Sequence, residues 1–166
     1  VMCIRNCFIM NKQMESYTES REHIADENIL TLSKDGENVI VFMLDRAIGT
    51  YMPYLLEENE SIKEMFDGFT YYPNTLSFGK STNFCTPALF AGYEYTPENI
   101  NKRDKESLKD KQNEALKVMP VLFSENGFNV VVTDPPYAGY TWDPDLSIYD
   151  GYGNIKAYIT EGAYND

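Results

Sequence analysis

The sequence is poor in positive charge, histidine, cysteine and long apolar runs. It has 26 acidic and 14 basic residues among 166, which gives a formal net charge of −12. An acidic excess of this size repels nucleic-acid phosphates and anionic membrane surfaces at long range, so neither is expected as the main partner. The same charge would favour a divalent cation.

The few cysteines and the single histidine exclude some kinds of site. Cys3, Cys7 and Cys85 are an odd number and lack the paired C-x-x-C spacing of a zinc knuckle, so neither that site nor a disulfide framework is indicated. His23 lies in a polar segment, where a surface position is expected. No apolar run approaches the length that spans a bilayer, and Arg5 interrupts the short apolar opening.

The sequence has enough apolar material for a core, because 43% of its residues are hydrophobic and 14% aromatic. Strands are predicted at 38–44, 69–72 and 128–133, and helices at 53–66, 81–91 and 113–126. The first and last strands are continuous apolar runs, typical of strands covered on both faces of a parallel sheet. This order predicts an α/β domain with a mostly parallel central sheet flanked by helices.

The remaining segments are predicted to be irregular. Residues 99–112 are dense in charges of both signs and are expected to be solvated. Residues 137–166 are rich in Tyr, Gly, Asp and Pro and show little periodicity. Residues 1–37 are interpreted as an N-terminal segment and connector. Their apolar opening fits either the end of a hydrophobic region upstream or a short element packed on the domain.

Two residues lie at positions where α/β domains typically have active-site residues. Asp45 directly follows the apolar run 38–44, and the carboxyl ends of strands in an open α/β sheet face the ligand crevice. Thr82 lies in the segment GKSTNFCTP, where a glycine-containing loop leads into a predicted helix. A helix N-terminus offers free N–H groups to a phosphate or sulfate. Asp45 could equally be a plain turn residue, and Ser81 or Thr82 a plain N-cap.

Weaker candidates could contact a substrate. Lys80 and Ser81 precede Thr82 and could contact its anionic group, although a solvated Lys80 is the simpler interpretation. Tyr137, Tyr140 and Trp142 follow the last predicted strand and could form an aromatic wall for a lipid or sugar. Ordinary packing explains these three residues equally well.

The joint order of these segments resembles a known superfamily. NVIVFMLD, PYLLEENESIKEMFDGFTYYPN, the Gly-Lys-Ser-Thr segment and VMPVLFSENGFNVVVTD follow one another as in the opening of sulfatases, lipoteichoic acid synthases and phosphoethanolamine transferases. These families share the alkaline phosphatase-like fold. The resemblance spans residues 38–134 and implies that 38–166 form the N-terminal part of a catalytic domain. It also implies that Asp45 is the first metal ligand. Thr82 matches the transferases' nucleophilic threonine, five residues before a proline.

The resemblance implies a metal-dependent phospho- or sulfo-transfer enzyme. A divalent zinc, manganese, magnesium or calcium ion would be held by Asp45 and Thr82, with further ligands beyond residue 166. Metal coordination would activate a hydroxyl that is a poor nucleophile near neutral pH. The implied substrates are phospholipid headgroups or cell-envelope polymers. The implied location is the extracytoplasmic side of a bacterial membrane, reached through regions outside this chain.

Two alternatives stay open. The segment from Cys85 to Pro87 also resembles the sulfatase signature Cys-x-Pro-x-Arg, whose cysteine matures to formylglycine, although Leu89 replaces the arginine. Cys85 would then be the nucleophile of a sulfatase or phosphodiesterase. From a different class, the domain could be catalytically silent and bind envelope glycans through its tyrosine-rich surface. Bound metal and a modified threonine would distinguish an enzyme from a binding domain.

Overall fold

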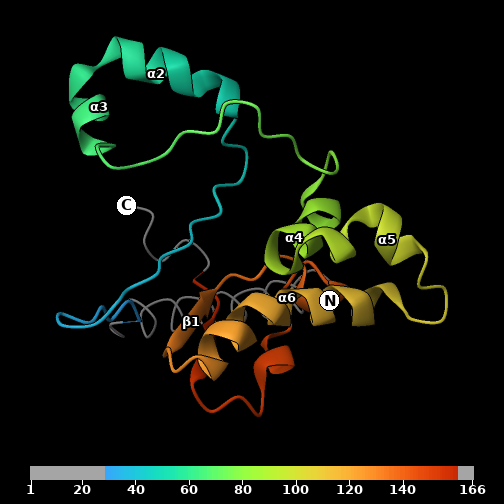
Figure 1. The fold of residues 1–166 in the computed structure, drawn as a ribbon. Coiled ribbons are helices and arrows are strands. Elements are labelled where there is room, and N and C mark those ends of the chain that lie inside the picture. Colours follow the sequence, from blue (N-terminus) through green and yellow to red (C-terminus); the bar gives the residue numbers. More distant parts are fainter. Residues whose placement is uncertain (1–28, 161–166) are drawn as a thin grey trace, which may run out of the picture.

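The computed structural model describes residues 29–160. In this range the protein is a mixed α/β structure in which helices outweigh strands (Figure 1). The helices are α2 (Met52–Glu58), α3 (Glu60–Met65), α4 (Thr82–Ala91), α5 (Pro97–Asn101) and α6 (Leu108–Glu125), with short 3-10 helices η1 (Gly49–Tyr51), η2 (Tyr93–Tyr95), η3 (Ala138–Tyr140) and η4 (Leu146–Tyr149). The predictions on Cys3, Cys7 and His23 fall outside the described residues.

The strands β1 (Val130–Thr133) and β2 (Ile155–Tyr158) pair in parallel. Val130 lies opposite Ile155, and Thr133 opposite Tyr158. The α/β class is therefore confirmed, and the one pair of strands in residues 29–160 is parallel, but the predicted pairing among 38–44, 69–72 and 128–133 does not form.

The core lies where α6 packs on this sheet. Ala115 and Leu116 of α6 are fully buried, at 0% exposure. A cluster of buried side chains on β1, η4 and β2 packs nearby: Val132, Tyr149 and Ile155. The hydroxyl of Tyr149 donates to the carbonyl of Leu116 over 3.3 Å, which joins the cluster to α6. Burial, which disfavours the charged phenolate, raises the pKa of the Tyr149 hydroxyl.

Helix α4 packs against α6 through its middle, where Thr86 and Pro87 are buried. Pro87 cannot donate a backbone hydrogen bond. The hydroxyl of its neighbour Thr86 donates to the carbonyl of Thr82 over 2.7 Å. The helix ends at Gly92, whose φ of +83° suits a residue without a Cβ. The chain then turns into η2.

The predicted helices are largely confirmed. The pattern at 81–91 forms α4, and Gly127 has the expected positive φ (+88°) after α6. The predicted helix 53–66 is divided into α2 and α3, because Asn59 is extended and its side chain accepts a hydrogen bond from the amide of Ser61.

Two predictions of irregular structure were wrong. The charged segment 99–112 contains the end of α5 and the start of α6, because Ser107 caps α6 by accepting from the amide of Asp110. Lys111 in that segment is buried, and its ammonium donates to the carbonyl of Ile100 over 3.0 Å. The tyrosine-rich tail contains β2, which exists because β1 offers it a hydrogen-bonded edge.

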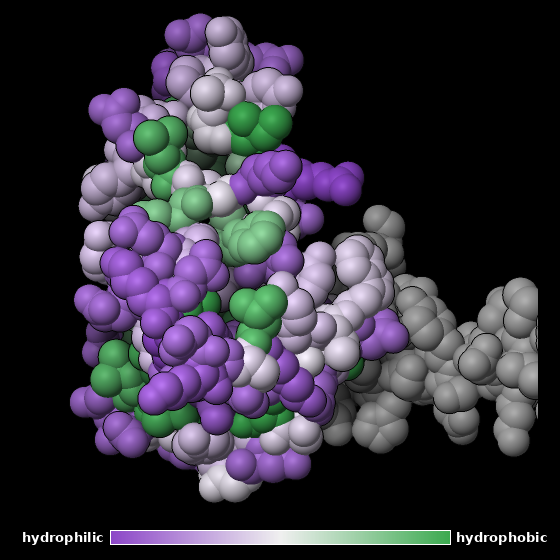
Figure 2. Space-filling view, turned by 90° about the vertical axis from the view of Figure 1, so that its right-hand side faces the viewer, coloured by the Kyte–Doolittle hydropathy of each residue, from purple (hydrophilic) through white to green (hydrophobic). Residues whose placement is uncertain are grey.

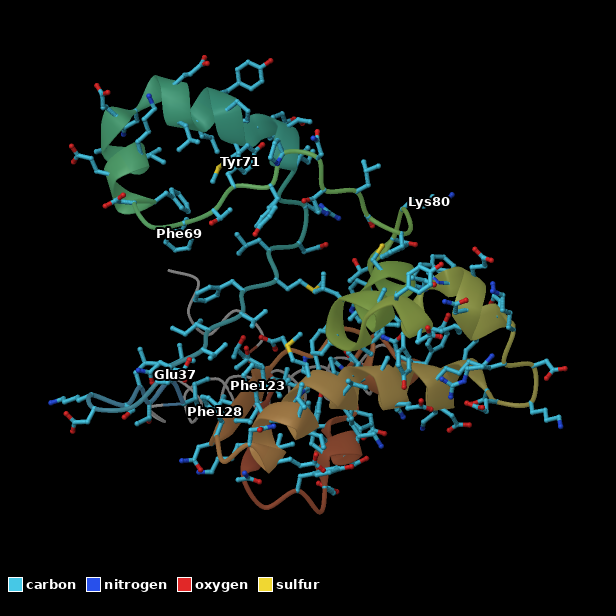
Figure 3. All side chains as sticks on the ribbon, in the orientation of Figure 1. Glu37, Phe69, Tyr71, Lys80, Phe123 and Phe128 are labelled. Atoms are coloured by element: carbon cyan, nitrogen blue, oxygen red, sulfur yellow. The ribbon has the colours of Figure 1, made fainter. Side chains whose placement is uncertain are left out.

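Of the predicted strands, only 128–133 forms, as β1. Residues 38–44 run without a ladder partner, and Phe42 is 77% exposed. Every second residue of this segment, at Val39, Val41 and Met43, lines an apolar cavity of about 200 Å³ against β1 and α6. Figure 3 shows two other lining residues, Phe123 and Phe128, beside this extended segment. Their rings meet edge to face at 5.3 Å.

Helices α2 and α3, with the segment that follows them, form an arm that leaves the core (Figure 1). The predicted strand 69–72 lies in this arm and does not form. Instead, Phe69 packs edge to face on Phe66 at 5.3 Å, and the hydroxyl of Tyr71 donates to the carbonyl of Gly49 over 3.1 Å. In the view of Figure 2, hydrophilic side chains cover much of the surface and separate apolar groups lie between them.

Candidate functional site

The two residues that the sequence singles out meet in space. The hydroxyl of Thr82 donates to Oδ1 of Asp45 over 3.4 Å, although the two residues are 37 positions apart. Asp45 is exposed at the end of the extended segment 38–44, and Thr82 is half-buried at the first position of α4. The contact is long for a hydrogen bond between oxygens. It therefore places the two groups side by side without binding them tightly.

The N-terminus of α4 leaves donors available beside this pair. Ser81 is the N-cap residue, in extended conformation, and its side chain makes no capping hydrogen bond. The carbonyl of Ser81 accepts from the amides of Phe84 and Cys85. By helix geometry the amides of Thr82 and Asn83 have no partner inside the helix. An anion placed at the Thr82 hydroxyl would therefore face two backbone donors.

The sulfur of Cys85 is directed to the loop before the helix. Its thiol donates to the carbonyl of Gly79 over 3.0 Å and lies 2.8 Å from the hydroxyl of Ser77. The Ser77 hydroxyl donates to the same carbonyl over 2.7 Å. Lys80, on this loop, is exposed and projects outward (Figure 3). The hydrogen bonds of Cys85 thus go to the loop, whereas that of Thr82 goes to Asp45.

The aromatic candidates lie in the turn after β1. Tyr137 and Trp142 meet edge to face, with ring centroids 6.1 Å apart. Trp142 is 83% exposed and Tyr140 36% exposed. Hydrogen bonds with two α6 side chains hold this turn, and neither Asp45 nor Thr82 takes part in them.

This turn has an unusual backbone that the sequence did not predict. Asp134, Tyr137 and Tyr140 all have positive φ, between 48° and 58°. Left-handed conformations of residues other than glycine cost on the order of 1 kcal/mol each. Two α6 side chains hold the turn: Gln112 donates to the carbonyl of Pro136 over 3.2 Å, and Asn113 accepts from the amide of Gly139 over 2.8 Å.

The Asp45–Thr82 pair fits one side of a metal site. A carboxylate and a hydroxyl are oxygen donors, which hard divalent cations prefer. Their 3.4 Å separation matches that of two ligands of one tetrahedral ion with bonds of about 2.1 Å, namely about 3.4 Å. Residues 29–160 hold no group of three or more His, Cys, Asp or Glu side chains that could bind a metal ion. The pair thus supplies part of a ligand set.

The groups with the most perturbed pKa values lie elsewhere. The guanidinium of Arg103 donates two hydrogen bonds to the carboxylate of Glu114, and the hydroxyl of Tyr95 donates a third over 2.5 Å. The hydrogen bond from Arg103 is the main cause that lowers the pKa of Glu114, and the hydrogen bond to Glu114 is the main cause that raises the pKa of Tyr95. These groups satisfy one another and indicate a structural cluster, in which the ion pair joins the segment after α5 to α6 and the Tyr95 hydroxyl joins η2 to the same carboxylate.

Comparisons of the chain with models of known protein families, with curated proteins and with solved structures find no match in any of the three. Among the helices of residues 29–160, none combines the length and the apolar character needed to cross a membrane.

Proposed function

We propose that this chain is the N-terminal part of an alkaline phosphatase-like catalytic domain, and that it transfers phosphoryl or sulfuryl groups with Thr82 as nucleophile. The observation that carries the proposal is the 3.4 Å contact between the Thr82 hydroxyl and Asp45. The sequence pattern selects the same two residues independently, as the helix-opening nucleophile and the strand-ending metal ligand. The parallel β1–β2 pair is consistent with the proposed fold.

The proposed first step uses residues of this chain. Oxygen Oγ1 of Thr82 attacks the phosphorus or sulfur of an ester, and the bond to the leaving oxygen breaks as the new bond forms. The hydroxyl donates its hydrogen toward Asp45; as Oγ1 attacks, this proton passes to solvent water, and the leaving oxygen takes up a proton from water. The amides of Thr82 and Asn83 face the non-bridging oxygens and oppose their charge. A divalent ion held by Asp45 and Thr82 would supply Lewis acidity and lower the pKa of the hydroxyl.

The covalent Thr82 ester is then opened by water or by an acceptor hydroxyl. The new nucleophile gives up its proton as it bonds to phosphorus or sulfur, and Oγ1 leaves and takes up a proton. Hydrolysis and transfer to another envelope molecule therefore differ only in the acceptor. The negative charge of the chain disfavours a nucleic-acid substrate. The proposed substrates are phospholipid headgroups or envelope phosphate and sulfate esters, on the outer side of a bacterial membrane.

The same geometry favours Thr82 over Cys85 as nucleophile. Cys85 lies three residues further along α4, and its thiol is engaged by the loop carbonyl of Gly79. A sulfatase that uses Cys85 would need this contact to break, and it would lack the arginine that Leu89 replaces. Lys80, Ser81, Tyr140 and Trp142 remain proposed substrate contacts.

A catalytically silent glycan-binding domain is the second candidate. The observation that favours it is Trp142, which is 83% exposed on the strained and well-anchored turn. An exposed indole that packs edge to face on Tyr137 suits stacking on a sugar ring.

Turnover by the complete protein separates the candidates. Wild type, Thr82→Ala and Thr82→Ser are assayed with a nitrophenyl phosphodiester and a nitrophenyl sulfate, after titration with zinc, manganese, magnesium or calcium. We expect metal-dependent turnover that Thr82→Ala lowers by at least about 100-fold and that Thr82→Ser partly restores. Wild-type turnover in Thr82→Ala would refute the assignment.

A further inference from the structure

The contact between Ser77, Gly79 and Cys85 is not used by the proposed chemistry, and it lies directly before the proposed nucleophile. The carbonyl of Gly79 accepts from Oγ of Ser77 over 2.7 Å and from Sγ of Cys85 over 3.0 Å. A carbonyl oxygen has two lone pairs, so it can accept both. The Ser77 hydroxyl also receives the amide of Gly79 over 3.3 Å. We call these three residues the loop lock.

Close packing adds to the hydrogen bonds. A Cβ at position 79 would lie 2.9 Å from Cβ of Phe84, which is closer than real Cβ atoms approach. The backbone of the loop therefore lies directly on the first turn of α4, and only glycine permits this approach. Cys85 is three residues after Thr82, so its thiol joins the loop to the same helical turn that carries the Thr82 hydroxyl.

The position of this turn matters because the other half of the site is weakly held. Asp45 follows a segment without ladder partners, and its contact with Thr82 is long and partly exposed. Ser81, between the loop lock and Thr82, makes no side-chain capping bond to the helix. The loop lock thus holds the chain on the N-terminal side of Thr82, where the Thr86 hydroxyl, which bonds the carbonyl of Thr82, does not reach.

We propose that Cys85 and Ser77 are positioning residues, which hold the loop on α4 and so set the place of Thr82 relative to Asp45 and to a bound anion. This rests on the proposed function of Thr82. It also gives Cys85 a role in which the thiol stays chemically unchanged.

Kinetics of the complete protein test the positioning role. Misplacing a nucleophile by a fraction of an ångström costs rate, so Cys85→Ala and Ser77→Ala should each lower kcat about tenfold with little change in KM. Cys85→Ser keeps a donor and should recover most of the loss. Thr75→Val is the matched control, because it removes a hydroxyl-to-carbonyl bond of the same loop, from Thr75 to Tyr72, outside the loop lock. Its kcat should equal that of wild type.

Alkylation tests the contact without turnover. Iodoacetamide is added to the folded protein, and mass spectrometry follows the peptide that contains Cys85. Ser77→Ala should raise the labelling rate severalfold over wild type and over Thr75→Val, because it removes the hydroxyl that lies 2.8 Å from the sulfur and covers it. An unchanged labelling rate would overturn the loop lock itself.

Thr82→Ala separates the two proposals. If it abolishes turnover while Cys85→Ala keeps the wild-type kcat, the positioning role is wrong and the proposed function stands. If Thr82→Ala keeps turnover, the proposed function fails, and the positioning role fails with it.

Discussion

Replacing Glu114 with glutamine should loosen the attachment of η2 to α6. The carboxylate of Glu114 accepts hydrogen bonds from Arg103 at 3.2 and 2.5 Å and from the Tyr95 hydroxyl at 2.5 Å. Tyr95 lies four residues after the end of α4, so its hydrogen bond to Glu114 helps to hold the C-terminal end of α4. Glu114→Gln keeps the shape of the side chain and removes its charge.

The size of the effect follows from exposure. The side chain of Arg103 is 28% exposed and that of Glu114 is 45% exposed. A fully exposed pair would contribute below about 1 kcal/mol, and breaking a buried one would cost about 3–5 kcal/mol. Because solvent screens a pair at this exposure, its contribution lies near that of an exposed pair. The hydrogen bond from Tyr95 to the same carboxylate adds to this contribution. We expect Glu114→Gln to lower the free energy of unfolding by about 1.5 kcal/mol at pH 7.

The direction in which this stabilisation changes with pH follows from the pKa of Glu114. The pKa of Glu114 is lower in the folded protein than its usual value of 4.5. Its contribution is therefore complete above that value and disappears as the pH falls through the lower folded pKa. Urea unfolding followed by circular dichroism measures the difference between wild type and variant at pH 7 and at stepwise lower pH. Glu125→Gln, an exposed change at the far end of α6, is the control. A loss no larger than that of the control, or one that persists undiminished in acid, would refute this reasoning.

Three further changes have defined outcomes. Leu116→Ala removes a fully buried side chain and should cost about 3 kcal/mol in the free energy of unfolding, measured by urea titration. Asp45→Ala should lower the metal content and the activity of the complete protein while changing its stability by less than about 0.5 kcal/mol, because the residue is exposed; unchanged metal content would contradict this. Gly79→Ala forces a Cβ against Phe84 and should destabilise by about 1–3 kcal/mol, whereas Gly49→Ala meets no atom within 4 Å and should be neutral; equal effects in thermal unfolding would argue against close packing of the loop.

Local signals explain which elements could be predicted. The helix α4 follows from its apolar pattern, and the end of α6 follows from Gly127, because both depend on residues close in sequence. The break at Asn59 was missed, since its side chain competes with the helix for a backbone donor. Strand β2 has only four residues, and its partner β1 lies more than 20 positions away. No local pattern encodes such a pairing.

The apolar run 38–44 was predicted to be a strand and does not form one. Its composition is that of a buried strand, yet in the structure it lies extended along a cavity without hydrogen-bonded neighbours. A strand requires a hydrogen-bonded partner, whereas the strand propensity of a segment shows only that its residues suit a strand.

The candidate site was predictable only in part. Asp45 and Thr82 were selected by position and by family resemblance, and the structure brings them together. Ser77 gave no signal, because its role depends on a carbonyl two residues away and a thiol eight residues away. Gln112 lay in a segment expected to be solvated, and its buried amide instead holds the turn after β1.

Covalent labelling of Thr82 tests the central claim most directly. The complete, metal-loaded protein is mixed with a nitrophenyl phosphodiester, quenched in acid, digested and analysed by mass spectrometry. The account predicts a phosphoryl-type adduct on the side chain of Thr82, absent from Thr82→Ala and strongly reduced in Asp45→Ala. Formylglycine at Cys85, or an adduct on any residue other than Thr82, would contradict it.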